Sequence, residues 1–479
     1  MADSVTDRVL ARLQDDEANA IERLCDWLRI PSVGTDPKFD EQTREAGAWA
    51  RDHLRESGFE AELVETAADG QRGHPAVLAR SPGADDYNGP HVLFYGHYDV
   101  QPPDPVDLWE TGPFEPVIKK AENGIGERVV ARGACDDKGQ VAMFLEAMRA
   151  WFRETGEAGG GVKYTVLLEG EEESGSVNLP AFVEAHKDEL SKCGVCVISD
   201  TGMLGRGKPA ITYGVRGMEY TEVVLHGPDQ DLHSGLWGGR CPNPINELVK
   251  VLSQLHDADR RVTVPGFYEG VKEPAPEELE RWKALGIDAG TQLKTIGLGP
   301  EADVGEAGYD ATTRNWARPT CDINGIIGGY TGEGAKTVIP SHASAKVSFR
   351  LVDDQDPEKV RDAFFAWLDE RTPPGCRWEK IDHHGGAPAT VAVDSPELTA
   401  ARKAITRATG EDAALIKSGG SIPVAGLLKE RLGLDTIFMG FGLDDDRVHS
   451  PNEKFELDCF RMGSRSHVVL VEELRAMGG

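Results

Sequence analysis

Apolar residues recur along this chain in two rhythms, which predict helices and buried strands. In some segments they return every three or four positions, as on one face of a helix. Between these segments lie short continuous apolar runs, which predict strands buried on both faces. The predicted helices cover residues 9–30, 45–57 and 141–152, and the predicted strands cover 91–95, 164–168 and 195–199. Helices that alternate with buried strands are typical of an α/β fold with a mostly parallel, helix-covered sheet.

The pattern changes near residue 211 and returns after residue 386. The middle of the chain combines alternating strands with helices, which is typical of an α+β domain with its own sheet. The predicted strands there are 220–226 and 345–352, and the predicted helices are 243–256 and 357–370. Beyond it, helices at 396–409 and 421–430 and a strand at 436–439 resume the first pattern. We therefore predict that an α+β domain of residues 213–386 is inserted in an α/β domain formed by 1–212 and 387–479.

Charge and cysteine content limit the partners and the compartment. A formal charge of −29 argues against binding to nucleic acid or to an anionic membrane, since phosphate groups would be repelled. No apolar run approaches the ~20 residues that span a bilayer, and the first residues lack the apolar segment of a signal peptide. The eight cysteines are scattered, which favours reduced thiols, and the Cys193–Cys196 pair is interpreted as structural. We expect a cytoplasmic protein.

Candidate metal ligands follow the ends of the predicted strands. The three adjacent carboxylates of residues 171–173 repel one another, so a cation is expected beside them. Taken singly, His97 could be a hydrogen-bonded core histidine, and Asp136 could cap the next helix. Five loops of this kind nevertheless offer oxygen or imidazole ligands. They carry His97 with Asp99, Asp136 with Asp137, Glu172 with Glu173, Asp200, and His449.

The composition of this ligand set indicates its metals. Histidine mixed with carboxylates suits zinc, manganese or cobalt, and the lack of cysteine argues against a purely structural zinc site. The excess of carboxylates indicates two metals that share one carboxylate and activate a hydroxide between them. One acid must stay free of metal to carry protons. We therefore predict two divalent ions per subunit, zinc first, with manganese or cobalt as alternatives.

Short motifs between residues 90 and 455 follow one another in the order of a known family. They are His97-Tyr98-Asp99-Val100-Gln101-Pro102, Arg132-Gly133 through Asp136-Asp137-Lys138-Gly139, Glu169-Gly170 through Glu172-Glu173-Ser174-Gly175-Ser176, Ser199-Asp200, Thr212 to Gly217, Asp231-Leu232-His233-Ser234-Gly235, Gly334 to Pro340, Gly419-Gly420-Ser421-Ile422-Pro423, and His449-Ser450-x-Asn452-Glu453. In these motifs the chain resembles the carnosinase-type dinuclear metallopeptidases, relatives of aminoacylase, carboxypeptidase G and succinyl-diaminopimelate desuccinylase. It looks closest to the cytosolic non-specific dipeptidase branch.

The resemblance implies a role for each residue of the metal site. Asp136 would bridge the two metals, with a cis peptide after it. One site would be completed by His97 and Asp200, and the other by Glu173 and His449. Asp99 would orient His97, and Glu172 would be the general base that takes a proton from the bridging water. Glu171 stands where close relatives carry an apolar residue, and we expect it to point away.

The resemblance also implies how the substrate is bound. The inserted domain would serve as a lid and dimerisation domain of a homodimer, and His233 would reach across the dimer to stabilise the oxyanion. Thr337, Arg350, Gly420 and Ser421 would hold the C-terminal carboxylate of a short peptide, although Arg350 could instead form a surface ion pair. The implied activity is hydrolysis of dipeptides or short peptides. An N-acyl-amino-acid amidohydrolase with the same core, or a non-catalytic peptide-binding homologue, is the alternative.

Overall fold

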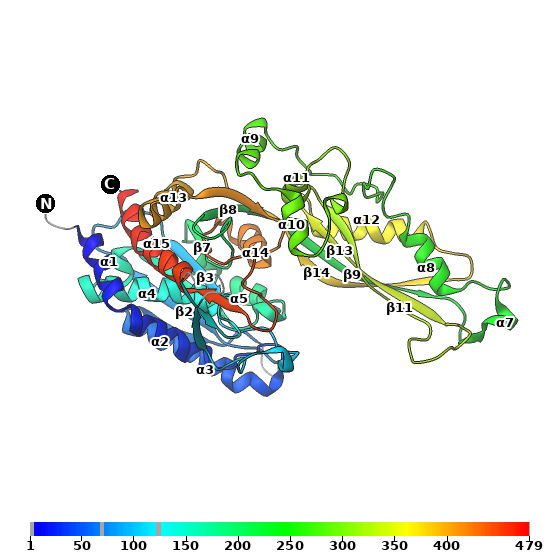
Figure 1. The fold of residues 1–479 in the computed structure, drawn as a ribbon, viewed down its shortest axis with the longest axis horizontal. Coiled ribbons are helices and arrows are strands. Elements are labelled where there is room, and N and C mark those ends of the chain that lie inside the picture. Colours follow the sequence, from blue (N-terminus) through cyan, green and yellow to red (C-terminus); the bar gives the residue numbers. More distant parts are fainter. Residues whose placement is uncertain (1–3, 68–70, 121–125, 479) are drawn as a thin grey trace. The chain divides into compact units, whose positions relative to one another are not determined.

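The chain folds into two compact units. The first contains residues 1–213, 391–416 and 428–479, and the second contains 214–390 and 417–427. The computed structural model describes residues 4–67, 71–120 and 126–478 (Figure 1). Residues 417–427 cluster with the second unit, whereas the predicted boundaries placed all of 387–479 with the first. The functional roles of the two domains stay predictions.

A mainly parallel sheet forms the centre of the first unit, which confirms the predicted fold class. Its order is β1-β2-β6-β3-β7-β17-β8, with β16 paired to β8. The strands β6, β3, β7 and β17 are parallel neighbours, whereas β1, β2 and β8 join antiparallel. The bounds are β1 Glu60–Val64, β2 Ala76–Pro82, β3 Val92–His97, β6 Lys163–Glu169, β7 Val195–Ile198, β8 Ala210–Val215, β16 Ala414–Ser418 and β17 Thr436–Phe438. Every residue of β3 and β7 is buried, as the continuous apolar runs predicted.

Helices pack on this sheet and on one another. Helix α15 lies against α4 and α13, and α3 lies against β1 and β2. The helices are α1 Val5–Asp15, α2 Glu17–Leu28, α3 Asp40–Glu56, α4 Lys138–Thr155, α5 Leu179–Ala185, α6 Lys187–Leu190, α13 Pro396–Thr409, α14 Pro423–Leu432 and α15 Leu457–Ala476. The single helix predicted over residues 9–30 is wrong, because Asp16 leaves the helical conformation (φ −95°, ψ 6°) and separates α1 from α2.

The first unit also contains a smaller antiparallel sheet, and its strand β18 follows the loop that contains His449. Its order is β18-β5-β4, with bounds Lys454–Glu456, Glu127–Val130 and Val117–Lys120. The sequence of residues 117–131 predicts a hairpin that turns at Asn123-Gly124. Strands β4 and β5 are antiparallel partners, as this prediction requires, and Asn123-Gly124 itself lies outside the described residues. Short 3₁₀ turns connect the larger elements. They are Pro37–Phe39, Val106–Leu108, Ala158–Gly161 and Glu172–Ser174, with Pro300–Ala302 in the second unit.

The second unit is an α+β domain built on an antiparallel sheet of order β11-β13-β9-β14. These strands are Thr320–Gly328, His342–Leu351, Gly217–His226 and Arg377–Gly386, and two-residue strands lie at β10 Leu232–His233, β12 Val338–Ile339 and β15 Ala389–Thr390. Strand β9 alternates buried and half-buried residues, so one face of the sheet forms the core. Helices α8 (Pro244–Leu252) and α12 (Pro357–Asp369) contribute Leu248, Phe364 and Trp367 to that core. The other helices are α7 Ser234–Trp237, α9 Pro276–Ala284, α10 Ala289–Thr295 and α11 Ala311–Ala317.

Among the described residues, none of the helices combines the length and the apolar character that crossing a bilayer requires.

Candidate metal centre

His97 is the last residue of β3 and is almost completely buried. Its Nδ1 lies 3.0 Å from the main-chain oxygen of Asp99 and 3.4 Å from Asp99 Oδ1. The spacing of His97-x-Asp99 predicts that both side chains lie on one face of a strand, but the strand ends at His97. The main-chain carbonyl is therefore the nearer partner. A proton on Nδ1 donated to Asp99 leaves Nε2 as the free ligand atom.

The structure brings the five predicted metal ligands into two groups that share Asp136. His97 Nε2 lies 3.1 Å from Asp136 Oδ1 and 3.8 Å from Asp200 Oδ2. On the other side, His449 Nε2 lies 2.9 Å from Asp136 Oδ2 and 3.3 Å from Glu173 Oε2. Within each group the ligand atoms lie within 4.8 Å of one another. Each group can therefore surround one cation, with one oxygen of Asp136 facing each.

The electrostatics of these groups fit a cation. Burial and the Asp136 charge raise the pKa of Asp200 to about 7. The pKa of Asp136 is lowered instead, because hydrogen bonds from His449 and His97 outweigh its burial. Glu173 Oε1 is buried and has no hydrogen-bond partner among the described residues. Crowded carboxylates and an orphaned oxygen are the features that a bound divalent ion would compensate.

Glu172 lies beside these ligands without belonging to either group. It begins a short 3₁₀ turn, Glu172–Ser174, that follows β6. Its main-chain N–H donates to Asp99 Oδ1 at 3.2 Å, and that of Glu173 donates to Asp99 Oδ2 at 3.1 Å. Burial raises the pKa of Glu172 well above its ordinary value. The structure thus holds a carboxyl group of raised pKa close to, but outside, the ligand set.

Glu171, the first of the three acids, is buried and has its own partners. Its carboxylate accepts from Asn178 Nδ2 at 2.8 Å and from the main-chain N–H of His74 at 3.1 Å. It is in neither ligand group, as expected. Its position is nonetheless not that of a surface residue, because it ties the turn after β6 to two other segments.

Three residues of the motifs support the ligands and had no role assigned from the sequence. Gln101 Nε2 donates to Glu173 Oε2 at 2.7 Å. The Asn452 side chain accepts from Glu110 N–H at 2.8 Å and donates to the Leu108 carbonyl at 2.9 Å, which anchors the loop of His449. Glu453 follows it and is completely buried.

The backbone is unusual at two of the ligands. The peptide bond between Asp136 and Asp137 is cis, as the resemblance implied. His449 has a positive φ of 61°, a conformation that non-glycine residues rarely adopt. A positive φ at a non-glycine residue persists only where the surroundings hold it, and such residues cluster at functional sites.

Two arginines of the second unit converge on the loop that contains Gly420. Arg350 Nη1 donates to Ser421 Oγ at 2.7 Å. Arg216 donates from Nε to the Gly419 carbonyl at 2.8 Å and from its main chain to the Gly420 carbonyl at 3.0 Å. Burial lowers the pKa of both guanidinium groups, that of Arg216 to about 10, with a contribution from the Arg350 charge. Sequence reasoning left Arg216 without a role.

Among the described residues, neither guanidinium has a direct ion-pair partner, although the charge of Asp322 acts on both from a greater distance. Within the described chain, no carboxylate oxygen lies within 4.0 Å of Arg216 or Arg350. The alternative interpretation, in which Arg350 forms a surface ion pair, is therefore not supported, because no carboxylate lies close enough to be its partner. Two half-buried cations without a direct ion pair are suited to bind an anion.

His233 and Thr337 lie together elsewhere in the second unit. Strand β10 pairs with β12, and the Ser234 N–H donates to the Thr337 carbonyl at 3.1 Å. The His233 ring is exposed, and its Nδ1 accepts from the Gly235 N–H at 3.0 Å. Its Nε2 is thus presented to the surface.

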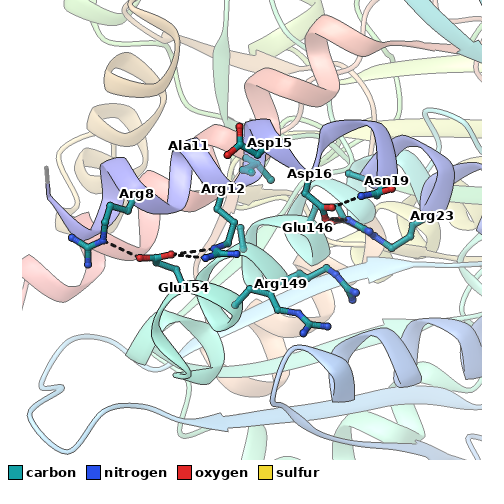
Figure 2. Close-up of a pocket in the computed structure, with 14 residues that line it drawn as sticks. Arg8, Ala11, Arg12, Asp15, Asp16, Asn19, Arg23, Glu146, Arg149 and Glu154 are labelled. Atoms are coloured by element: carbon teal, nitrogen blue, oxygen red, sulfur yellow. Dashed lines mark hydrogen bonds and ion pairs between the residues drawn. The ribbon is translucent and has the colours of Figure 1, made fainter.

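A pocket of ≈ 620 Å³ on the first unit has a different character (Figure 2). Arg8 and Arg12 of α1 pair with Glu154 of α4 at 2.9 and 3.0 Å, and Arg23 of α2 pairs with Glu146 of α4. These charges neutralise one another, and the pocket contains none of the predicted site residues. We interpret it as an ion-paired junction between helices.

A helix-covered parallel sheet whose strand ends assemble two histidine–carboxylate groups around a shared aspartate defines a metal-dependent hydrolase. Residues 93–473 match the model of Peptidase family M20/M25/M40, and the chain belongs to this family. It is 31% identical to the Cys-Gly metallodipeptidase DUG1 of Saccharomyces cerevisiae, over 98% of each chain. It is 32% identical to the beta-Ala-His dipeptidase of Homo sapiens, over 91% of this chain and 86% of that protein. The crystal structure of the M20 family metallo-carboxypeptidase Sso-CP2 from Sulfolobus solfataricus superposes with a TM-score of 0.83 at 30% identity, covering 95% of this chain and 99% of that one.

Proposed function

We propose that this protein is a two-metal exopeptidase that hydrolyses dipeptides or short peptides with a free C-terminal carboxylate. The observation that carries the proposal is the sharing of Asp136 between two ligand groups, with the unliganded Glu172 beside them. Relatives named for Cys-Gly and beta-Ala-His dipeptides support a dipeptide substrate.

Two divalent ions would be held by the five ligands. His97 and Asp200 serve one position and Glu173 and His449 the other, with Asp136 common to both. When bound, such ions polarise the scissile carbonyl and lower the pKa of water. Zinc suits this ligand set, and manganese and cobalt are the alternatives.

Glu172 is the proton carrier in this proposal. A carboxyl group of raised pKa can take a proton from the attacking water and return it to the leaving amine. Asp99 fixes the turn on which Glu172 lies, since it accepts the main-chain N–H groups of both Glu172 and Glu173. The same turn therefore fixes both the base, Glu172, and the neighbouring ligand, Glu173.

The second unit supplies the groups that recognise the substrate. The Arg350 guanidinium and Ser421 hydroxyl bind the C-terminal carboxylate, with Gly420 beside it, and Thr337, which lies next to His233, joins them together with that histidine. His233 of the partner subunit donates to the oxyanion that forms at the scissile carbonyl. These roles require the second unit to act as a lid that brings Arg350 and His233 to a metal centre.

A homodimer formed through the second unit follows from this use of His233. Its edge strand β11 exposes Ile323, Ile326 and Ile327, with exposed fractions of 43%, 50% and 64%. An edge strand with exposed apolar side chains invites pairing with another chain. We expect this edge to be covered in the dimer. The cytoplasmic location and the absence of nucleic-acid and membrane partners stay predictions.

A metal-reconstitution assay over a substrate panel tests the proposal. Chelator-treated protein is loaded with Zn²⁺, Mn²⁺ or Co²⁺ and given dipeptides, tripeptides, C-terminally amidated dipeptides, and N-acetyl and N-succinyl amino acids. We expect cleavage of dipeptides with a free carboxylate, dependent on metal. Preferential cleavage of the N-acyl amino acids would make the protein an amidohydrolase instead, and tight binding without cleavage would make it a peptide-binding homologue.

A further inference from the structure

Glu453 holds the loop of Asp136 by hydrogen bonds to its main chain. Its Oε1 accepts the N–H groups of Cys135 at 2.9 Å and Asp136 at 3.0 Å. Its Oε2 accepts the N–H of Gly133 at 3.0 Å and Arg132 Nη1 at 2.7 Å. The side chain has no exposed surface, so water does not compete for these bonds.

The pattern of donors requires a carboxylate at this position. All four groups around Glu453 donate, two to each oxygen, and none accepts. A glutamine would turn its NH₂ group toward two donors in either orientation, which leaves buried N–H groups without partners. An aspartate would withdraw both oxygens by one methylene group.

Glu453 also belongs to the loop that presents His449. Three residues lie between the two, and one of them, Asn452, is anchored to residues 108 and 110. The Glu453 carbonyl accepts the Ala131 N–H at 3.1 Å, so the two loops are joined by main chain as well. Glu453 thus connects the loop that contains His449 with the loop that contains Asp136.

We propose that Glu453 is a positioning residue that fixes Asp136 relative to His449 and so sets the affinity of both metal positions. This inference rests on the proposed metal centre. Asp136 contributes one oxygen to each ligand group, and a shift of its main chain would displace both oxygens together. Residues that orient metal ligands in this way affect metal affinity by about 10–100-fold.

A purely structural ion pair is the competing explanation. Arg132 and Glu453 are both buried, and the Arg132 guanidinium lies over the Trp109 ring at 5.5 Å. Loss of such a pair lowers stability whether or not a metal site is near. The two explanations differ in what they predict for metal affinity in a protein that remains folded.

The test compares Glu453→Gln with Glu456→Gln. Glu456 is a buried carboxylate of β18, the strand that begins directly after Glu453, and it pairs with Lys454 at 3.1 Å and Arg206 at 2.9 Å rather than with main-chain groups of the Asp136 loop. Zn²⁺ affinity and stoichiometry are measured on the full chain by competition with a chromogenic chelator, and thermal unfolding is recorded on the metal-free proteins. We expect both variants to unfold at lower temperature, but only Glu453→Gln to bind Zn²⁺ at least about 10-fold more weakly.

The outcomes separate the inference from the proposed function. Wild-type Zn²⁺ affinity in folded Glu453→Gln would overturn the positioning role. A wild-type protein that does not bind two Zn²⁺ ions would instead overturn the metal centre on which it rests. Should Glu453→Gln not fold, Glu453→Asp takes its place with the same expected loss, because it keeps the charge and shortens the reach.

Discussion

Asp99 Oδ2 accepts the main-chain N–H of Glu173 at 3.1 Å. Asp99 Oδ1 accepts the N–H of Glu172 at 3.2 Å, so both oxygens hold the turn that carries the base and a ligand. The same residue receives the Nδ1 proton of His97 on its main-chain oxygen. Gly34 makes room for this arrangement, since a Cβ there would lie 2.7 Å from Asp99 Oδ2. Asp99 therefore connects His97 with Glu172 and Glu173, a wider role than orientation of one histidine.

The first prediction concerns Asp99→Asn. The amide NH₂ would face a main-chain N–H of Glu172 or Glu173, so the turn should shift and metal affinity should fall by about 10–100-fold. Metal content after dialysis, measured beside kcat, checks this. Asp435→Asn, which alters an exposed partner of Lys429, is the control and should behave as wild type. An Asp99→Asn protein with unchanged metal content and kcat would contradict the expectation.

The second prediction separates the base from its neighbour. Glu172→Gln should lose activity by about 10²–10⁴-fold while it keeps its metal, since the residue is in neither ligand group. Glu173→Gln should lose metal as well, because it removes a ligand oxygen. Metal analysis and kcat of both variants decide between the roles. Near-normal activity of Glu172→Gln would show that another group carries the proton.

The sequence predicted those features that depend on local patterns. The buried strands β3 and β7 were visible as continuous apolar runs, and their ends located His97 and Asp200. Three further loops offered Asp136, Glu173 and His449, and the structure brings all five together. The break at Asp16 was missed because apolar spacing continues across it.

The supporting contacts could not be predicted because their partners are distant in sequence. Glu171 bonds to the main chain of His74, 97 residues away, and Glu453 bonds to Arg132, 321 residues away. Apolar periodicity reports which face of an element is buried, but not which polar groups meet after folding. Arg216 was missed for the same reason, since its partner loop lies 203 residues further along the chain.

The third prediction concerns recognition of the substrate carboxylate. Arg350→Met should raise KM for a dipeptide with a free C-terminus about 30-fold, in keeping with roughly 2 kcal/mol for a hydrogen bond between charged groups. The C-terminally amidated dipeptide lacks that charge and should be affected much less. Arg377→Met, at an exposed position of β14, is the matched control. An equal change for both substrates would remove Arg350 from carboxylate recognition.

The fourth prediction concerns stability at acidic pH. His467 of α15 is buried against Phe94 and Phe144, and burial lowers its pKa to about 3. The unfolded chain binds a proton near pH 6.5, whereas the folded chain does not. The stability from neutral His467 is therefore complete above pH 6.5 and is lost as pH falls toward 3, by up to about 1.4 kcal/mol per unit.

His467→Gln should accordingly flatten the pH dependence of stability. Gln can still hydrogen-bond to Ser199 Oγ, which lies 3.1 Å from His467 Nε2, but it does not titrate. Thermal unfolding of metal-free wild type and variant between pH 7.5 and about 5 measures the difference without a contribution from metal release. Parallel curves would mean that His467 has the same pKa in both states.

The fifth prediction tests whether His233 acts across a dimer. His233→Ala and Glu172→Gln should each be nearly inactive, because each removes one necessary group from every site. In a mixed dimer, the subunit that carries His233→Ala keeps Glu172 and receives His233 from its partner, so one of its two sites is complete. Equal mixing of subunits should therefore restore about one quarter of the sites. Co-refolding of the two variants followed by a dipeptidase assay measures the recovery.

The control pairs His233→Ala with a chain that carries both substitutions, and no combination of these two chains contains a complete site. Recovery in the first mixture but not in the second requires that His233 serve the partner's metal centre, whereas no recovery in either would confine it to its own subunit or remove it from catalysis.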